Sequence, residues 1–456
     1  MKENLKISRR ICFFLLALSS TFVAGYAQQI TPETALERYI HNDDRTFGWE
    51  IRDTCAAEGV KIYSLTLYSQ KWQNMIWKHE LIVCVPETLD KEVAMLFVNG
   101  GSINGGFPKI IPFDDGITTA MATMAVKNKA LAATLRQVPN QPLYDGLNED
   151  ALISYTLEKF RKTGDYSLPL LFPMVKSAVS AMDAVQEFAM KTLGKKVSGF
   201  VVSGASKRGW TTWLTGAIRD SRVIAIAPMV IDMLNMPLTL DYQKKLYGEY
   251  SEQINDYVKM DIPQMIHSDE GKAIVAMLDP YSYRQNITMP KMLIMGTNDP
   301  YWTVDAVKHY LPDIPGTNFL VYVPDAGHGL GNKKQALTAL NAFFGFTLTH
   351  TRYPVCSWEI AEKGKHIELK ISLSPEKIVA ARLWKATSDS RDFRKSKWAS
   401  SNIALKNGDL QVKLSYPAKD YQAFYVELTY KDVNNEDFTV CTQIYTADRK
   451  HVFINE

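Results

Sequence analysis

A serine stands where an apolar run gives way to a helix-like segment. The stretch Val201–Trp210 reads VVSGASKRGW, so Ser206 falls at the junction. This layout is typical of a nucleophile elbow, a strained strand-to-helix turn that exposes a serine hydroxyl and requires small neighbours. Gly204 and Gly209 are small, although Arg208 stands where the G-x-S-x-G pattern has its second glycine. The plain alternative is a buried serine in an ordinary strand-turn-helix.

A carboxylate and a histidine follow in the order that such a site requires. α/β-Hydrolases supply their triad in the chain order Ser, Asp or Glu, His, from the ends of successive strands. Asp299 follows the strand-like run 290–296, and His328 lies in a glycine-flanked loop after the run 319–323. Each is more often structural when it occurs alone, so the prediction depends on all three residues together. Two other carboxylates compete for the role of the acid: Asp305 and Asp325.

The chain also offers backbone donors for an oxyanion. This type of fold takes one donor from the residue after the nucleophile and one from a loop after an early strand. Lys207 would supply the first N–H, and Gly101 or Ser102, after the strand-like run 94–98, would supply the second. The alternative for this loop is a plain turn, because Asn-Gly and Gly-Gly are common turn dipeptides.

Alternating strand and helix patterns predict an α/β-hydrolase domain over residues 28–352, with a mostly parallel sheet covered on both faces. Strands are expected at 60–67, 79–85 and 94–98, and a helix at 175–193. After Pro354 the pattern becomes period-two, as in Ile367, Leu369, Ile371 and Leu373. Residues 353–456 are therefore expected to form a C-terminal immunoglobulin-like β-sandwich.

Two segments are expected to form the walls of a substrate pocket. An insertion at about 232–287 predicts a helical cap over the catalytic edge, and segment 114–170 is the other wall. The candidate substrate-binding residues are Arg136, Gln141 and Arg208. The candidate aromatic lining residues, each of which could equally be a packing residue, are Tyr242, Tyr247, Tyr250 and Tyr257.

The first 27 residues predict a secretory signal peptide. A basic start precedes the apolar run 11–23, and small residues precede a cleavage site after Ala27. An uncleaved anchor is the alternative, although the run is short for a bilayer span. We therefore expect a periplasmic or extracellular protein. The segment carries a charge of +3, equal to that of the whole chain, so the mature protein is near neutral and no nucleic-acid or membrane partner is expected.

Four cysteines remain after signal removal, and they allow three pairings in an oxidising compartment. Cys55–Cys84 with Cys356–Cys441 is the economical choice, because each pair then lies within one predicted domain. Four buried free thiols are the alternative. The sequence shows no metal-binding motif such as C-x-x-C or H-E-x-x-H, so no metal and no cofactor are expected.

Several motifs together resemble a known group of proteins. The chain is similar to the PhoPQ-activated pathogenicity-related protein family of secreted bacterial α/β-hydrolase-like proteins. The resemblance implies that fold, with Ser206, Asp299 and His328 as its candidate site. The matching segments are 138–143 (VPNQPL), 204–213 (GASKRGWTTW), 279–283 (DPYSY), 296–299 (GTND) and 382–386 (RLWKA).

The sequence therefore predicts a secreted serine hydrolase that cleaves an ester or amide bond of a small-molecule, peptide or carbohydrate-borne acyl substrate. Two alternatives remain open. One is a serine peptidase. The other is a catalytically silent binding protein on the same fold, with its β-sandwich as a docking module.

Overall fold

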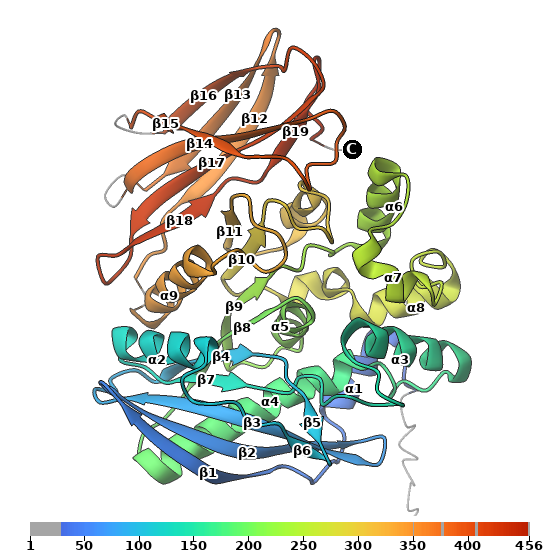
Figure 1. Ribbon diagram of the computed structural model, residues 1–456, viewed down its shortest axis with the longest axis vertical. Coiled ribbons are helices and arrows are strands. Elements are labelled where there is room, and N and C mark those ends of the chain that lie inside the picture. The colour runs from blue at the N-terminus through green and yellow to red at the C-terminus, as the bar shows by residue number, and fades with distance from the viewer. Residues whose placement is uncertain (1–28, 350, 375–377, 406–408, 455–456) are drawn as a thin grey trace, which may run out of the picture.

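A computed structural model of the chain describes residues 29–349, 351–374, 378–405 and 409–454 (Figure 1). The predicted signal peptide lies outside the described residues. The chain starts with helix α1 (Pro32–Ile40), which packs against α4 (Leu171–Phe188) and α8 (Asp269–Leu278). Strands β1–β3 lie at one end of the molecule, and the strands that follow α9 (Lys334–Thr349) lie at the other.

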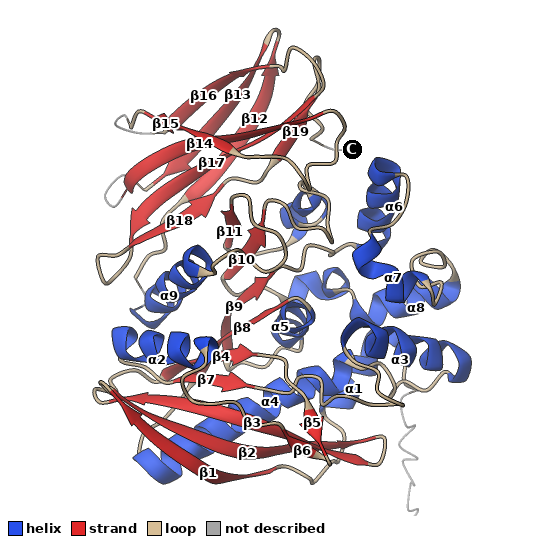
Figure 2. Cartoon of the chain, viewed as in Figure 1, coloured by secondary structure: helices blue, strands red, loops and turns tan. Residues whose placement is uncertain are grey.

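A mixed, mostly parallel sheet forms the centre of the protein (Figure 2). Its strands are ordered β1-β2-β3-β7-β4-β8-β9-β10-β11, and all neighbours from β7 to β11 are parallel. The prediction of an α/β protein with a mostly parallel sheet is thus confirmed. The bounds are β1 (Gly48–Ala57), β2 (Val60–Trp72), β3 (Met75–Pro86), β4 (Val93–Val98), β7 (Ala132–Leu135), β8 (Gly199–Ala205), β9 (Val223–Met229), β10 (Lys291–Gly296) and β11 (Asn318–Val323).

Helices cover both faces of this sheet, which explains why its central strands are almost wholly apolar. Helices α2 (Gly116–Asn128) and α9 pack into one hydrophobic core, whereas α4 and α5 (Lys207–Ala217) pack into the other. Helix α2 begins where Asp115 accepts hydrogen bonds from the amides of Ile117 and Thr118, a standard N-cap. The predicted helix at 175–193 is confirmed as α4 and a π-helical turn at Ala189–Leu193.

The insertion between β9 and β10 is helical. It contains α6 (Met236–Tyr247), α7 (Asn255–Val258), α8 and the 3-10 turn Pro280–Asn286. Buried Asp279 holds it together by accepting hydrogen bonds from the amides of Asn235, Met236 and Tyr281. Burial raises the pKa of Asp279 to about 7, although these bonds favour its charged form.

The C-terminal strands form two sheets. Strands β12 (Cys356–Lys363), β13 (His366–Leu373) and β16 (Leu410–Ser415) form one, and their apolar residues share a core with those of the other sheet. The second sheet extends the central sheet, because β18 pairs with β11 at Leu320 and Cys441. The immunoglobulin-like assignment and the boundary at residue 353 stay predictions. The strands of the second sheet are β14 (Ile378–Ser388), β15 (Ala399–Ile403), β17 (Tyr421–Lys431), β18 (Asp437–Cys441) and β19 (Tyr445–Ala447).

The four cysteines of the described chain are free thiols. The pairing chosen as economical is therefore not formed. Cys55 and Cys84 both lie opposite Ile62, one on each side of β2, so a whole strand separates them. Burial raises the pKa of the Cys84 thiol to about 12.

We expect that a protein ending at residue 352 will aggregate. The truncation would unpair β11 and uncover the apolar face of α9, where Phe346 contacts Phe438 of β18. Soluble yield and size-exclusion chromatography of residues 28–352 and 28–456 test this. A soluble, monodisperse shorter protein would instead mean that the two parts fold independently.

Candidate active site

Ser206 occupies a strained turn between β8 and α5. Its backbone has φ 59° and ψ −124°, in a region that residues other than glycine rarely adopt. The Ser206 amide donates a hydrogen bond to the Met229 carbonyl at 2.9 Å, which fixes the turn to β9. A Cβ atom on Gly204 would lie 2.7 Å from the Arg208 carbonyl oxygen, and one on Gly209 would lie 2.7 Å from that of Met229. Both positions therefore require glycine.

The three predicted catalytic side chains form one hydrogen-bonded chain. The Ser206 Oγ lies 2.8 Å from His328 Nε2, and His328 Nδ1 lies 2.8 Å from Asp299 Oδ2. The other Asp299 oxygen accepts a hydrogen bond from the Tyr301 amide at 2.9 Å. The Asp299 side chain is only 6% exposed, whereas that of His328 is 24% exposed. This geometry allows the imidazole to take a proton from the serine and the carboxylate to orient the ring.

Neither competing carboxylate has this position. Asp305 is buried elsewhere, where it pairs with Lys308 at 2.9 Å and accepts a hydrogen bond from Thr446. Asp325 accepts the Trp398 amide at 3.0 Å.

The C-terminal strands hold the loops that carry the acid and the base. The Asn298 side-chain amide, next to Asp299, donates to the carbonyl oxygens of Phe393, Arg394 and Ser396 at 3.3, 3.2 and 2.7 Å. These three residues belong to the β14–β15 connection, as does Trp398, whose amide bonds Asp325 on the histidine loop. One connection thus contacts both loops that carry the candidate acid and base.

The loop after β4 packs against the elbow. A Cβ atom on Gly100 would lie 2.7 Å from Arg208 Nη2, so the glycine lets the guanidinium approach. Gly101 has a positive φ of 143° and follows directly. Lys207 is the first residue of α5, so the helix itself provides no acceptor for its amide N–H. The oxyanion role of Lys207 and Gly101 remains a proposal.

The long side chain of Arg208 turns away from the elbow and binds a carboxylate. Its two terminal nitrogens donate to the two Glu149 oxygens at 2.7 Å each, and its Nε donates to the Val138 carbonyl. Burial opposes ionisation of Glu149, but the hydrogen bonds and charge of Arg208 outweigh it and lower the carboxyl pKa to about 2. Gln141 completes the group by accepting the Glu149 amide at 2.8 Å.

The candidate substrate-binding residues Arg136, Gln141 and Arg208 lie outside the pocket lining. Arg136 is only 1% exposed and bonds Asp115, the N-cap of α2, together with Thr118. All three side chains bond neighbouring protein groups, and a role in substrate binding stays a prediction.

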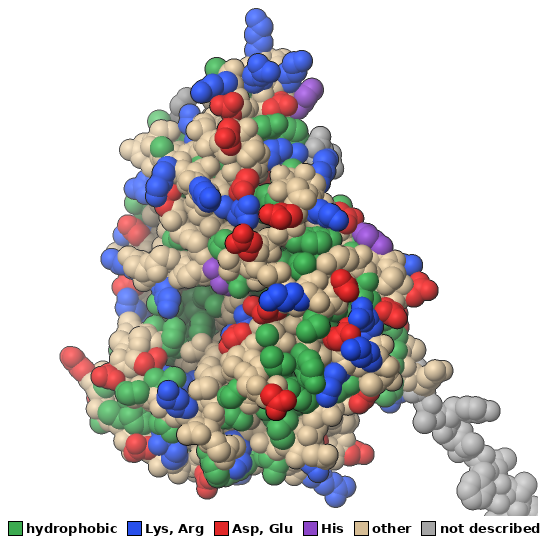
Figure 3. Space-filling view, turned by 45° about the vertical axis from the view of Figure 1, so that its right-hand side comes forward, with side chains coloured by type: hydrophobic (Ala, Val, Ile, Leu, Met, Phe, Trp, Pro, Cys, Tyr) green, Lys and Arg blue, Asp and Glu red, His purple; other side chains and the backbone are tan. Residues whose placement is uncertain are grey.

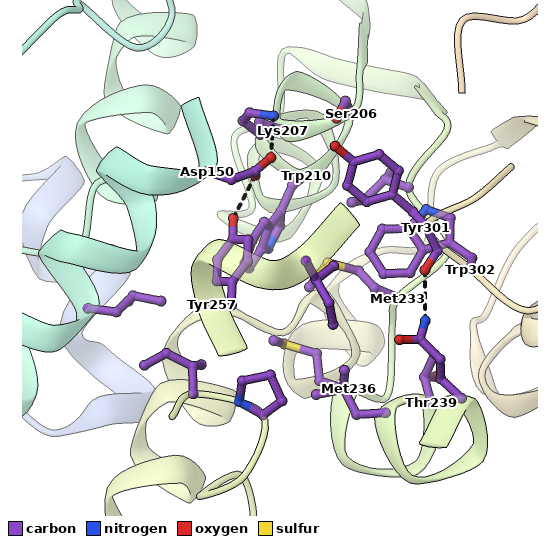
Figure 4. A pocket seen from close by; sticks show the side chains of 17 residues that line it. Asp150, Ser206, Lys207, Trp210, Met233, Met236, Thr239, Tyr257, Tyr301 and Trp302 are labelled. Atoms are coloured by element: carbon purple, nitrogen blue, oxygen red, sulfur yellow. Dashed lines mark hydrogen bonds and ion pairs between the residues drawn. The ribbon is translucent and has the colours of Figure 1, made fainter. Parts of the chain in front are cut away.

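An apolar pocket with a volume of about 60 Å³ opens beside Ser206 (Figure 4). The helical insertion, α3 (Glu149–Thr163) and the segment after Asp299 all contribute to it. Of the four predicted aromatic lining residues only Tyr257 is among those that line it. Sequence reasoning missed Tyr301 and Trp302, although their position directly after the acid was a usable signal. The lining residues are Asp150, Leu157, Ser206, Lys207, Trp210, Ile231, Met233, Met236, Thr239, Leu240, Gln243, Ile254, Tyr257, Ile262, Pro263, Tyr301 and Trp302.

The surface shows no concentration of one charge on the face in Figure 3, where acidic and basic side chains are interspersed. Within the described ranges, no three His, Cys, Asp or Glu side chains gather as a metal site would require. None of the described helices combines the length and apolar character needed to cross a membrane.

The fold and the site together define an α/β protein with a hydrogen-bonded serine, histidine and aspartate at a strand-to-helix turn. The chain belongs to the PhoPQ-activated pathogenicity-related protein family, whose model matches residues 36–394. It is 31% identical over 451 residues to the autocrine proliferation repressor protein A of Dictyostelium discoideum, covering 91% of this chain and 90% of that protein.

Solved structures with a similar chain path include three enzymes. Acetyl xylan esterase 1 from Thermoanaerobacterium sp. JW/SL YS485 matches with a TM-score of 0.46 and 15% identity, over 70% of this chain and 94% of that one. The acetyl xylan esterase from Paenibacillus sp. R4 matches with a TM-score of 0.45 and 13% identity, over 68% of this chain and 92% of that one. The S-formylglutathione hydrolase from Agrobacterium tumefaciens matches with a TM-score of 0.42 and 11% identity, over 66% of this chain and 99% of that one.

Arg208→Ala is expected to destabilise the protein by roughly 1–3 kcal/mol and to reduce turnover, because Glu149 would lose its bidentate partner beside the elbow. A depressed carboxyl pKa stabilises the folded state above the usual pKa, and this contribution disappears as the pH falls towards about 2. The difference in melting temperature between the variant and wild type should therefore shrink in acid. Melting curves from pH 7 to pH 3 measure it.

Lys207→Ala is the comparison for this experiment. Lys207 is also a cationic neighbour of the nucleophile, and its Nζ donates to Asp150 at 2.9 Å, but the alanine variant keeps the backbone N–H. We expect it to keep most activity on a neutral ester. An inert Arg208→Ala beside an inactive Lys207→Ala would reject this division of roles.

Proposed function

We propose that this chain is a secreted serine hydrolase of the α/β-hydrolase type that cleaves an acyl bond. The observation that carries the proposal is the unbroken hydrogen-bonded chain from Ser206 through His328 to Asp299, which starts at a backbone strained in the way an elbow requires. The strand order and the family membership agree with it.

The chemistry follows from the positions of the atoms. Ser206 Oγ attacks the substrate carbonyl carbon while His328 Nε2 accepts the serine proton. The bond to the leaving group then breaks, and His328 returns the proton to the leaving oxygen or nitrogen. Water hydrolyses the acyl-enzyme by the same route in reverse. Asp299 holds Nδ1–H throughout, and the amides of Lys207 and Gly101 stabilise the negative oxygen of both tetrahedral intermediates.

The pocket favours a substrate with an apolar group. Aliphatic, methionine and aromatic side chains form most of its wall, so a hydrocarbon portion gains by leaving water there. Small-molecule esters fit this description, and so do acyl groups carried on a peptide or carbohydrate. The predicted signal peptide directs this activity to the periplasm or the outside of the cell.

A catalytically silent binding protein is the rival function. It is supported by the similarity to the autocrine proliferation repressor protein A, because repression of proliferation does not by itself require an enzymatic reaction. Covalent labelling of the serine separates the two functions.

Ser206→Ala is expected to abolish both turnover and labelling by a fluorophosphonate probe while leaving the melting temperature close to that of wild type. The substitution deletes one hydroxyl and keeps a small residue, and loss of a triad member commonly costs a factor of ~10⁴ or more. Gel fluorescence and p-nitrophenyl ester hydrolysis measure the two effects. If the wild type itself resists labelling, the chain is not a serine hydrolase.

Asp299→Asn should lower kcat by roughly 10⁴, because the amide would favour the wrong imidazole tautomer. Asp305→Asn is the matched control, since Asp305 is an equally buried aspartate that bonds Lys308 and Thr446 rather than His328. We expect it to lower the melting temperature but to leave the rate of the folded enzyme nearly unchanged. The reverse ranking of the two rates would assign the acid to Asp305.

A further inference from the structure

One polar side-chain group in the pocket lacks a partner within the described protein. Ser206 bonds His328, and every other polar side chain of the lining except that of Tyr301 contacts another residue. Those contacts are Lys207 and Tyr257 with Asp150, Gln243 with the Tyr301 carbonyl and the Ser251 amide, Thr239 with the Leu234 carbonyl, Trp210 with that of Leu278 and Trp302 with that of Val230.

The Tyr301 ring lies beside the candidate base. The Tyr301 ring stacks on the His328 imidazole, with 4.1 Å between centroids and 30° between planes. Figure 4 shows the Tyr301 hydroxyl pointing towards the side of the pocket where Ser206 and Lys207 lie. Its direction is fixed from both ends of the residue, because the Tyr301 amide bonds Asp299 and its carbonyl accepts Gln243 at 2.7 Å.

The hydroxyl stays protonated at working pH. Burial and the carboxylates of Asp150, Asp299 and Glu149 raise the pKa of Tyr301 to about 12. It is therefore a neutral hydrogen-bond donor in a mostly apolar pocket, available to an acceptor on a bound ligand.

We propose that Tyr301 determines the substrate specificity of the site, an inference that rests on the proposed function. Its hydroxyl would donate a hydrogen bond to an oxygen atom of the substrate's acyl group, close to the reacting carbonyl. The candidate oxyanion donors are backbone amides at the start of α5 and after β4, whereas Tyr301 stacks on His328 and offers a side-chain hydroxyl in the pocket lining. The favoured substrates are then esters of oxygenated acyl groups, with a hydroxyl, ether or carbonyl oxygen at the mouth and hydrocarbon deeper in the pocket.

The test compares two esters of nearly equal shape, p-nitrophenyl methoxyacetate and p-nitrophenyl butyrate, in which one oxygen replaces one methylene. The ether oxygen also makes the ester intrinsically more reactive, so the decisive quantity is the change in the ratio of the two kcat/KM values between proteins. Tyr301→Phe keeps the ring and its stack on His328 but loses the donor. We expect it to lower the methoxyacetate-to-butyrate ratio about 10-fold relative to wild type.

Tyr250→Phe is the matched control. Tyr250 belongs to the helical insertion that forms part of the pocket wall, but its hydroxyl bonds the Pro263 carbonyl at 3.3 Å and it does not line the pocket. The ratio should stay at the wild-type value in this variant. An unchanged ratio in Tyr301→Phe would overturn the inference, whether both rates fall together or neither falls.

Fluorophosphonate labelling keeps this result separate from the proposed function. A wild-type protein that does not label refutes the hydrolase. A protein that labels but cleaves neither ester is tested by protection from labelling with methoxymethylboronic and propylboronic acids, which mimic the two acyl groups without turnover. Preferential protection by the methoxy compound that is lost in Tyr301→Phe supports the inference, and equal protection in both proteins overturns it.

Discussion

The reversal of the chain at Ser206 is the constraint on which the site depends. A buried strand must turn into a helix within one residue, and that residue has a positive φ although it carries a side chain. The strain persists only because neighbouring backbone leaves no other path. Gly204 and Gly209 meet carbonyl oxygens at distances that no Cβ could tolerate, and Ser206 is tied to β9 through its amide. The displaced glycine then leaves Arg208 inside the turn, where it needs a partner.

The contacts of Arg208 connect the elbow to the start of α3 and to the family motif at 138–143. Arg208 binds Glu149 and the Val138 carbonyl, and Gln141 binds Glu149. A buried guanidinium is tolerated because it meets a carboxylate bidentately and also satisfies a backbone oxygen. Asp232, in the segment after β9, shows the opposite case: a buried carboxyl without a bidentate cationic partner. Burial raises its pKa to about 7, and the hydrogen bond from Tyr310 only partly offsets this.

The C-terminal strands belong structurally to the edge of the sheet that carries the candidate triad. Their sheet continues the central sheet through β11 and β18, and the β14–β15 connection bonds the loops of both Asp299 and His328. A detachable docking module would not need such contacts. The arrangement resembles bracing instead, since the side-chain amide of Asn298, immediately beside the candidate acid, shares its two N–H donors among three carbonyl oxygens.

The sequence by itself indicated an α/β pattern, a serine at a strand-to-helix turn and the aspartate and histidine that join it in one hydrogen-bonded chain. It could do so because periodicity is local and because strand ends in a parallel sheet converge on one edge. The helical character of the insertion between β9 and β10 could be predicted for the same reason.

Only the tertiary structure decided which side chains face the pocket. Arg136 and Gln141 are polar loop residues that turn inward to brace the fold, whereas Tyr301 turns towards the imidazole. The free thiols of Cys55 and Cys84 depend on strand register, and the union of the two sheets depends on the single pairing of Leu320 with Cys441. Contacts between residues far apart in the chain fix all of these features, and no local pattern encodes such contacts.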